Sequence, residues 1–223
     1  MNCPHEVFPA LAGLPVIHAF TGRLPGLDMQ TDRSTALMRL EAHHAELRES
    51  LGIGTLRYIT AEQVHGAGVA VVNSASADRI PAVDGLVTDD PRVCLGIYVA
   101  DCAPVFLVDA VRGVIACVHS GKKGTAAGIV GVALGKMIAE FGCEPSRIVA
   151  QIGPCIRPPN YETDIAADIA RQCRAAGLSS VHDCGICTAA NVARYYSYRR
   201  EMGQTGRMAA FFALRPHREP LVH

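Results

Sequence analysis

The amino-acid sequence predicts a mixed α/β fold in which much of the sheet is antiparallel. Short runs of β-branched and apolar residues, separated by Gly, Pro, Asp and Asn, follow one another closely between residues 56 and 118. Neighbouring runs at this spacing leave no room for the helical crossover that joins parallel strands. Helical patterns lie before and after these runs. The sequence therefore excludes a fully parallel sheet.

The first half of the chain is predicted to contain one helix and six strands. Residues 1–30 read as a loop, a short strand at 16–20 and a second loop, because four prolines surround the strand. Apolar positions at steps of three and four predict an amphipathic helix over 32–51, with His44 on its apolar stripe and Gly52 at its end. The five predicted strands that follow are 56–60, 69–73, 93–99, 105–109 and 114–118.

The second half is predicted to alternate helices and strands. A glycine-lysine loop at 119–125 leads into a helix of small and apolar residues that continues to about residue 141. The remaining predicted elements are a strand at 147–152, a helix at 163–176, a helix at 188–198 and a closing strand at 208–214. With no linker, internal repeat or low-complexity stretch, residues 1–223 are predicted to form a single domain.

Composition excludes several classes of protein. A chain of 223 residues with 49% hydrophobic residues can bury roughly 70% of its unfolded surface, so it needs no disulfides to build a core. Nine irregularly spaced cysteines, some inside apolar runs, indicate reduced thiols and a cytoplasmic protein. Twenty-one basic and 21 acidic residues, without a long basic run, argue against general nucleic-acid binding. The apolar runs are far shorter than the roughly 20 residues that span a bilayer, so no membrane role is expected.

Three residues of metal-binding type lie where predicted strands end: His65, Cys102 and His119. Two imidazoles and a thiolate are suitable zinc ligands, and three protein ligands leave a fourth position for water or substrate. No local spacing brings the three together, so the alternative of two hydrogen-bonded histidines and a small buried cysteine stays open.

The loop after His119 is a candidate anion site. Backbone N–H groups at the start of a helix attract anions, and Lys122 and Lys123 add positive charge. The loop is not a Walker motif, which requires Gly-Lys-Ser/Thr after the spacer. A solvated lysine pair on a helix-capping turn is an equally good interpretation.

Two other motifs are weaker. Cys184-Gly185-Ile186-Cys187 is a C-x-x-C without a second copy or the βαβ context of a thioredoxin-like site. Tyrosines and arginines alternate between residues 195 and 207, but in a neutral protein such a segment is expected to pack its tyrosines and to pair or solvate its arginines.

Several motifs in order resemble the YfiH family, also called the laccase-domain or polyphenol oxidase family. The resemblance covers about residues 16–214. The matching motifs are Gln63-Val64-His65-Gly66, Val83-Asp84-Gly85-Leu86-Val87-Thr88, Ala100-Asp101-Cys102-Ala103-Pro104-Val105, the segment from His119 to Ala127, Ile152-Gly153-Pro154-Cys155-Ile156, and Tyr198-Arg199-Arg200 with Thr205-Gly206-Arg207.

The resemblance implies a zinc-dependent purine nucleoside phosphorylase that takes a purine nucleoside and phosphate, with adenosine deaminase activity in addition. By motif, the zinc ligands of the family fall on His65, Cys102 and His119. The resemblance also implies a compact α/β/β/α arrangement with mixed, largely antiparallel sheets.

One difference from the family concerns its usual His-Ala-Gly-Trp-Arg-Gly segment, where this chain has Lys122 and Lys123 in place of Trp and Arg. Lysine keeps the charge but loses the bidentate geometry with which arginine binds phosphate. The change also removes an apolar wall, so a divergent substrate is an open alternative.

For phosphorolysis, Lys122 and Lys123 are expected to bind the attacking phosphate near the helix start, with Arg199 or Arg207 as further candidates that the sequence does not place. For deamination, a zinc-bound water is expected to attack the purine while Asp84 or Asp101 carries protons. Two alternatives to the phosphorylase remain. One is a zinc hydrolase that edits peptidoglycan precursors, and the other is a non-catalytic module that binds a metal. A multicopper oxidase is not expected, because nine histidines without H-x-H pairs cannot form several copper sites.

Overall fold

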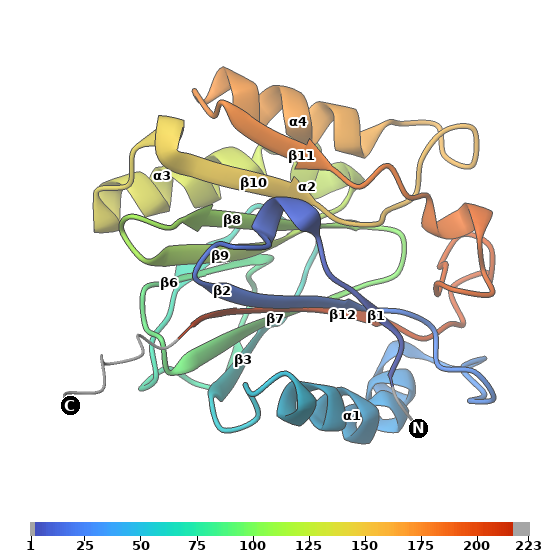
Figure 1. The fold of residues 1–223 in the computed structure, drawn as a ribbon. Helices are drawn as coiled ribbons and strands as arrows, with labels where there is room; N and C mark the ends of the chain where they lie inside the picture. Colours follow the sequence, from blue (N-terminus) through green and yellow to red (C-terminus); the bar gives the residue numbers. More distant parts are fainter. Residues whose placement is uncertain (1–2, 216–223) are drawn as a thin grey trace.

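The computed structural model describes residues 3–215 and has two six-stranded sheets stacked between layers of helices. Helix α1 (Arg33–Ser50) covers the outer face of one sheet, while α3 (Ile129–Phe141) and α4 (Ile165–Ala175) cover the outer face of the other (Figure 1). This arrangement confirms the predicted α/β/β/α layers. Among the described residues, no helix is both long enough and apolar enough to cross a bilayer.

Strand order differs between the two sheets. The first sheet runs β1 (His5–Glu6), β2 (Val16–Thr21), β12 (Met208–Leu214), β7 (Val93–Val99), β3 (Arg57–Ala61), β5 (Arg79–Ile80). The second sheet runs β11 (Ser180–Asp183), β10 (Ile148–Ile152), β8 (Ala103–Asp109), β9 (Val114–Ser120), β6 (Gly85–Thr88), β4 (Val69–Val71).

Antiparallel pairs dominate both sheets, and the parallel pairs lie toward the edges. Strand β3 runs parallel to β7 and β5, β11 runs parallel to β10, and β4 runs parallel to β6. Strands β8 and β9 are antiparallel neighbours, as the short connection between them requires. The prediction of mixed, largely antiparallel sheets is confirmed.

The core has two parts, one on each face of the second sheet. Along β8, Phe106 and Val108 join the cluster between the sheets, whereas Val105 and Leu107 join the cluster beneath α3 and α4. Successive side chains point to opposite faces of a strand, so a strand covered on both faces needs an unbroken apolar run. This explains why β8 and β9 read as continuous apolar segments. The cluster between the sheets also includes apolar residues of α1. That residues 1–223 form a single domain stays a prediction.

The helices begin and end at residues that the sequence marks. Asp32 accepts hydrogen bonds from the backbone N–H groups of Ser34 and Thr35 and so caps α1. The predicted long helix after the lysine loop is instead split into α2 (Lys122–Ala126) and α3. Gly128 lies between them with a φ of 73°, which an α-helix cannot contain.

The prediction of a helix at 188–198 is wrong. Only a 3₁₀ turn, η3 (Thr188–Ala190), forms, and turns follow it. The side chains of Thr188 and Ser197 both donate to the carboxylate of Asp101, and a continuous helix cannot direct both toward one residue. Tertiary hydrogen bonds therefore override the local helical pattern.

The structure has several short elements that the sequence analysis did not predict. They are the strands β1, β5, β6 and β11 and the 3₁₀ turns η1 (Pro9–Leu11) and η2 (Pro145–Arg147). Strands β1 and β5 have two residues each, which is too short for an alternating pattern. Strand β11 is polar and lies at a sheet edge.

Candidate functional site

The structure brings His65, Cys102 and His119 together. Their ligand atoms lie within 4.8 Å of one another, and the two imidazole rings meet edge to face with centroids 4.8 Å apart. His65 comes from the β3–β4 loop, Cys102 from the turn between β7 and β8, and His119 from the end of β9. His65 is exposed and His119 is buried, so the cluster is open on the His65 side. These three residues could hold one metal ion and leave a position for a further ligand.

A buried carboxylate behind the cluster holds both histidines. Asp84 Oδ1 lies 2.7 Å from His119 Nδ1, and the Asp84 side chain accepts backbone hydrogen bonds from Val64, His65 and Gly66. This cradle supports His65 in a left-handed conformation, with a φ of 61°. Because Nδ1 of His119 is engaged, Nε2 is the nitrogen available to a metal.

Asp84 is a positioning residue in this geometry. Its side chain is fully buried and does not line the pocket. Burial alone would raise the pKa of Asp84, but hydrogen bonds from His119 and from backbone N–H groups hold the pKa below its usual value. The expected role of Asp84 as a carrier of substrate protons therefore does not match its position.

Cys102 is set up to act as a thiolate. Burial would raise the pKa of its thiol, but the neighbouring imidazoles of His119 and His65 lower this pKa to about 6. The backbone at Gly121 packs closely against the Sγ atom of Cys102. A Cβ atom added at Gly121 would lie 2.8 Å from Cys102 Sγ, so only glycine leaves room there.

Asp101 joins the pocket wall to the segment after η3. It accepts hydrogen bonds from the hydroxyl groups of Thr188 and Ser197 and from the backbone N–H of Arg199. It lines the pocket but is only 7% exposed, and its φ of 83° is in the left-handed region. Both carboxylate oxygens are thus occupied, which favours a structural role over the expected proton transfer.

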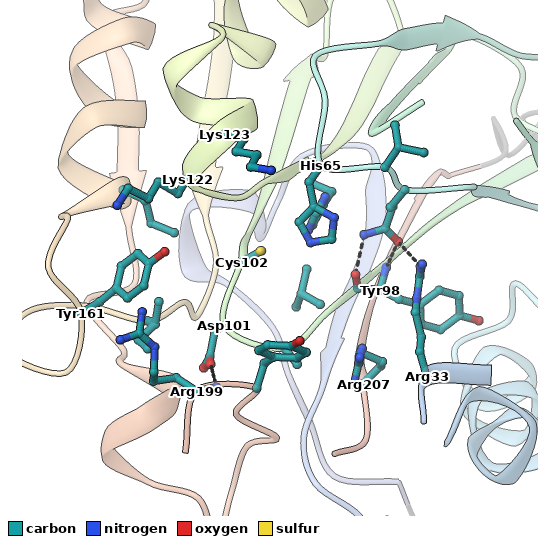
Figure 2. Close-up of a pocket in the computed structure, with 18 residues that line it drawn as sticks. Arg33, His65, Tyr98, Asp101, Cys102, Lys122, Lys123, Tyr161, Arg199 and Arg207 are labelled. Atoms are coloured by element: carbon teal, nitrogen blue, oxygen red, sulfur yellow. Dashed lines mark hydrogen bonds between the residues drawn. The ribbon is translucent and has the colours of Figure 1, made fainter. Parts of the chain in front are cut away.

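A pocket of about 550 Å³ opens above the cluster and carries excess positive charge. The basic residues that line it are Arg33, Lys122, Lys123, Arg199 and Arg207. Figure 2 shows the cluster in the middle of the pocket, with Lys122, Tyr161 and Arg199 toward one end and Tyr98, Arg33 and Arg207 toward the other.

The lysine loop forms one side of this pocket, and its two lysines differ. Lys122 Nζ lies 2.9 Å from Glu162, whose other oxygen lies 3.2 Å from Arg199 Nη2. Lys123 has no carboxylate partner among residues 3–215, and Figure 2 shows its amino group directed toward His65. Helix α2 has only five residues, so its backbone dipole contributes less than the sequence suggests.

Sequence reasoning missed Arg33, Tyr98 and Tyr161. Arg33 is the first residue of α1, and Tyr98 lies in β7, whose apolar pattern gives no sign of a site. The prediction of a helix from residue 32 places Arg33 in its first turn, but it does not show that the side chain points into a pocket.

The other motifs stay outside the site. Cys184 and Cys187 do not line the pocket, and all nine cysteines are free thiols. His44 is buried against Tyr98 and Phe211, as its position on the apolar stripe predicts.

Comparison with known proteins gives consistent results. The family described as multi-copper polyphenol oxidoreductase laccase matches residues 21–166 and 161–215. A Deinococcus radiodurans protein named purine nucleoside phosphorylase is 36% identical, covering 98% of this chain and 97% of its own. The Streptomyces coelicolor protein named purine nucleoside phosphorylase SCO2081 is 35% identical, covering 73% and 77%.

Solved structures show the same fold. The crystal structure of YlmD from Geobacillus stearothermophilus superposes with a TM-score of 0.82 at 27% identity, covering 94% of each chain. Bacillus licheniformis YfiH superposes with a TM-score of 0.79 at 23% identity, covering 89% of this chain and 92% of that one.

Proposed function

This chain belongs to the multi-copper polyphenol oxidoreductase laccase family, and from that premise we propose that it is a zinc-dependent purine nucleoside phosphorylase. The observation that carries the proposal is the open His-Cys-His cluster in the middle of a pocket lined by five basic residues. The relatives named purine nucleoside phosphorylase support the substrate class, which is a purine nucleoside together with phosphate.

The donor set fits zinc. Two imidazoles and a thiolate of lowered pKa match the ligands of a catalytic zinc site, and the carboxylate of Asp84 behind His119 matches the usual support of a zinc-bound histidine. A zinc ion held by His65, Cys102 and His119 would supply Lewis-acid chemistry toward a substrate oxygen or water. The copper in the family's name requires several histidine-rich sites, and the one ligand cluster found in the described residues has two histidines and a cysteine.

Phosphorolysis needs an anion held in line with the glycosidic bond. A phosphate oxygen forms a bond to the anomeric carbon of the ribose while the bond to the purine nitrogen breaks. The bonding electrons leave with the base, which takes up a proton from the phosphate monoanion or from solvent, and the products are free base and ribose 1-phosphate. The basic pocket attracts the phosphate, and Lys123, which has no carboxylate partner within residues 3–215, stabilises negative charge that develops on the departing base.

Adenosine deamination is the second candidate activity. The exposed side of the cluster at His65 leaves space for a water molecule beside the substrate. With Asp84 and Asp101 both held by hydrogen bonds, neither is free to carry the proton that this hydrolysis requires. The geometry thus favours phosphorolysis as the main activity.

The test is chromatography of adenosine and inosine incubated with the purified protein, with and without phosphate, together with the zinc content. We expect phosphate-dependent release of adenine and hypoxanthine and close to one zinc per chain. Cys102→Ser should lose both, while Cys117→Ser, which removes a buried thiol from the adjoining strand β9, should lose neither.

Other outcomes would contradict the proposal. Conversion of adenosine to inosine without phosphate would make the protein a deaminase. Zinc without turnover of either nucleoside would favour the peptidoglycan-editing hydrolase or the non-catalytic module.

A further inference from the structure

Two arginines meet at the end of the pocket away from Glu162. Arg33 begins α1 and Arg207 immediately precedes β12, so they are far apart in the sequence. Both line the pocket, and Figure 2 shows them side by side near Tyr98. The sequence alone does not predict this pair.

Arg207 is a buried cation with unused hydrogen-bond donors. The residue is only 8% exposed, and its Nη1 donates to the carbonyl groups of Thr205 and Gly206 at 2.6 and 2.9 Å. Its Nε and Nη2 have no partner among the described residues. The backbone contacts fix the plane of the guanidinium, and the remaining N–H groups are left to a ligand.

Arg33 is held less tightly but faces the same space. Its Nη2 makes one long hydrogen bond of 3.4 Å, to Oε1 of Gln63. The Gln63 side chain is itself fixed by hydrogen bonds to the backbone N–H and carbonyl of Tyr98. The pair therefore has a rigid support on one side and the open pocket on the other.

The carboxylates of Asp84 and Glu62 favour the charge of Arg33, and that of Asp101 favours the charge of Arg207, but none of them forms an ion pair with either arginine. Neither guanidinium is ion-paired with a carboxylate in residues 3–215, whereas Glu162 pairs with both Lys122 and Arg199 at the other end. Burial, and then the charge of Arg33, lower the pKa of Arg207, as expected for a buried cation that lies near a second one. Two neighbouring cations repel each other, and a bound anion offsets this repulsion by interacting favourably with both.

We propose that Arg33 and Arg207 form the binding site for inorganic phosphate, in preference to the lysine loop. This inference rests on the proposed function, because it assigns the co-substrate to one end of that pocket. Two guanidiniums can each donate in parallel to a phosphate, whereas Lys122 is already paired with Glu162. The nucleoside then extends from this phosphate over the cluster toward Lys123, so that a phosphate oxygen can reach the anomeric carbon.

The test is calorimetric titration of the zinc-loaded protein with inorganic phosphate, together with the KM for phosphate in the nucleoside assay. Arg33→Gln should weaken phosphate binding at least about tenfold, because it removes a charged hydrogen-bond donor. Arg79→Gln is the matched control. Arg79 is close enough to lower the pKa of Arg33, but it pairs with Glu62 and does not line the pocket, so phosphate binding should change less than about twofold.

A second variant guards against loss of folding. Arg207→Lys keeps the charge but loses the fixed fork, and it should raise the KM for phosphate with an unchanged far-ultraviolet circular dichroism spectrum. A double variant of Lys122→Ala and Lys123→Ala should lower kcat and leave phosphate binding intact. If this double variant weakens phosphate binding and Arg33→Gln does not, the inference is overturned.

The two proposals can fail separately. Arg33-dependent binding of phosphate without nucleoside turnover would retain the anion site and reject the phosphorylase. Phosphate-dependent turnover with an unchanged KM in Arg33→Gln would retain the phosphorylase and reject this site. Adenosine 5′-monophosphate tests a third possibility. If this nucleotide competes with inorganic phosphate for binding and is itself turned over, the site binds the ester phosphate of a nucleotide, and the inference is overturned.

Discussion

Asp84 Oδ1 lies 2.7 Å from Nδ1 of His119, and the same carboxylate oxygen accepts the backbone N–H of His65 at 2.9 Å. One buried side chain thus orients both histidines of the His-Cys-His cluster. Its other oxygen accepts the N–H groups of Val64 and Gly66 and closes the loop that carries His65. The geometry of the cluster therefore depends on Asp84 as well as on the three ligands.

Asp84→Asn is expected to weaken zinc binding by about 10- to 100-fold. An amide in place of the carboxylate puts a donor against groups that already donate, and it removes the negative charge beside His119. Competition with a chromophoric chelator measures the affinity. Asp90→Asn is the control, since Asp90 is also a buried acceptor but serves Ser74 and Arg92 outside the pocket. Equal losses in both variants would show that Asp84 contributes only to general stability.

Gly121→Ala is expected to weaken zinc binding at least about tenfold while the chain stays folded. The backbone at Gly121, with φ of −90° and ψ of 179°, suits any residue, so the damage comes from the 2.8 Å approach of the new Cβ to Cys102 Sγ. Gly135→Ala provides the comparison. It lies in α3 with nothing near the new Cβ, and should stabilise the protein by about 0.5–1 kcal/mol without changing zinc affinity. Unaltered zinc affinity in Gly121→Ala would contradict the close packing described here.

His44→Leu is expected to flatten the acid side of the stability curve. Burial, together with the charge of Arg48, lowers the pKa of His44 to about 3, whereas histidine in the unfolded chain has a pKa of about 6.5. Between these values the unfolded state binds the extra proton, so the free energy of unfolding falls as the pH falls below about 6.5.

The variant has no such group. Relative to the wild type it should gain about 2 kcal/mol between pH 7.5 and pH 5, measured by urea unfolding at both. His182→Leu, at an exposed position, is the control for loss of a histidine. A difference that does not change with pH would show that His44 is not held neutral.

Local pattern predicted the elements whose signal is contained in a few residues. Helix α1 follows from apolar spacing and from Gly52 after its end, and β8 and β9 follow from apolar runs that are buried on both faces. The predicted helix at 188–198 failed because Thr188 and Ser197 are committed to Asp101, a partner about ninety residues away in the chain. Local propensity carries no information about such a contact.

The sequence by itself determined the mixed α/β class with largely antiparallel sheets, the free thiols and the three candidate ligands, because residue chemistry and strand ends can be read locally. Only the tertiary structure decided what surrounds them. It puts Asp84 behind His119 instead of in the pocket, pairs Lys122 with Glu162, and brings Arg33 beside Arg207. These relations depend on how two sheets and α1 stack, and stacking is set by burial of the whole core, which no short segment encodes.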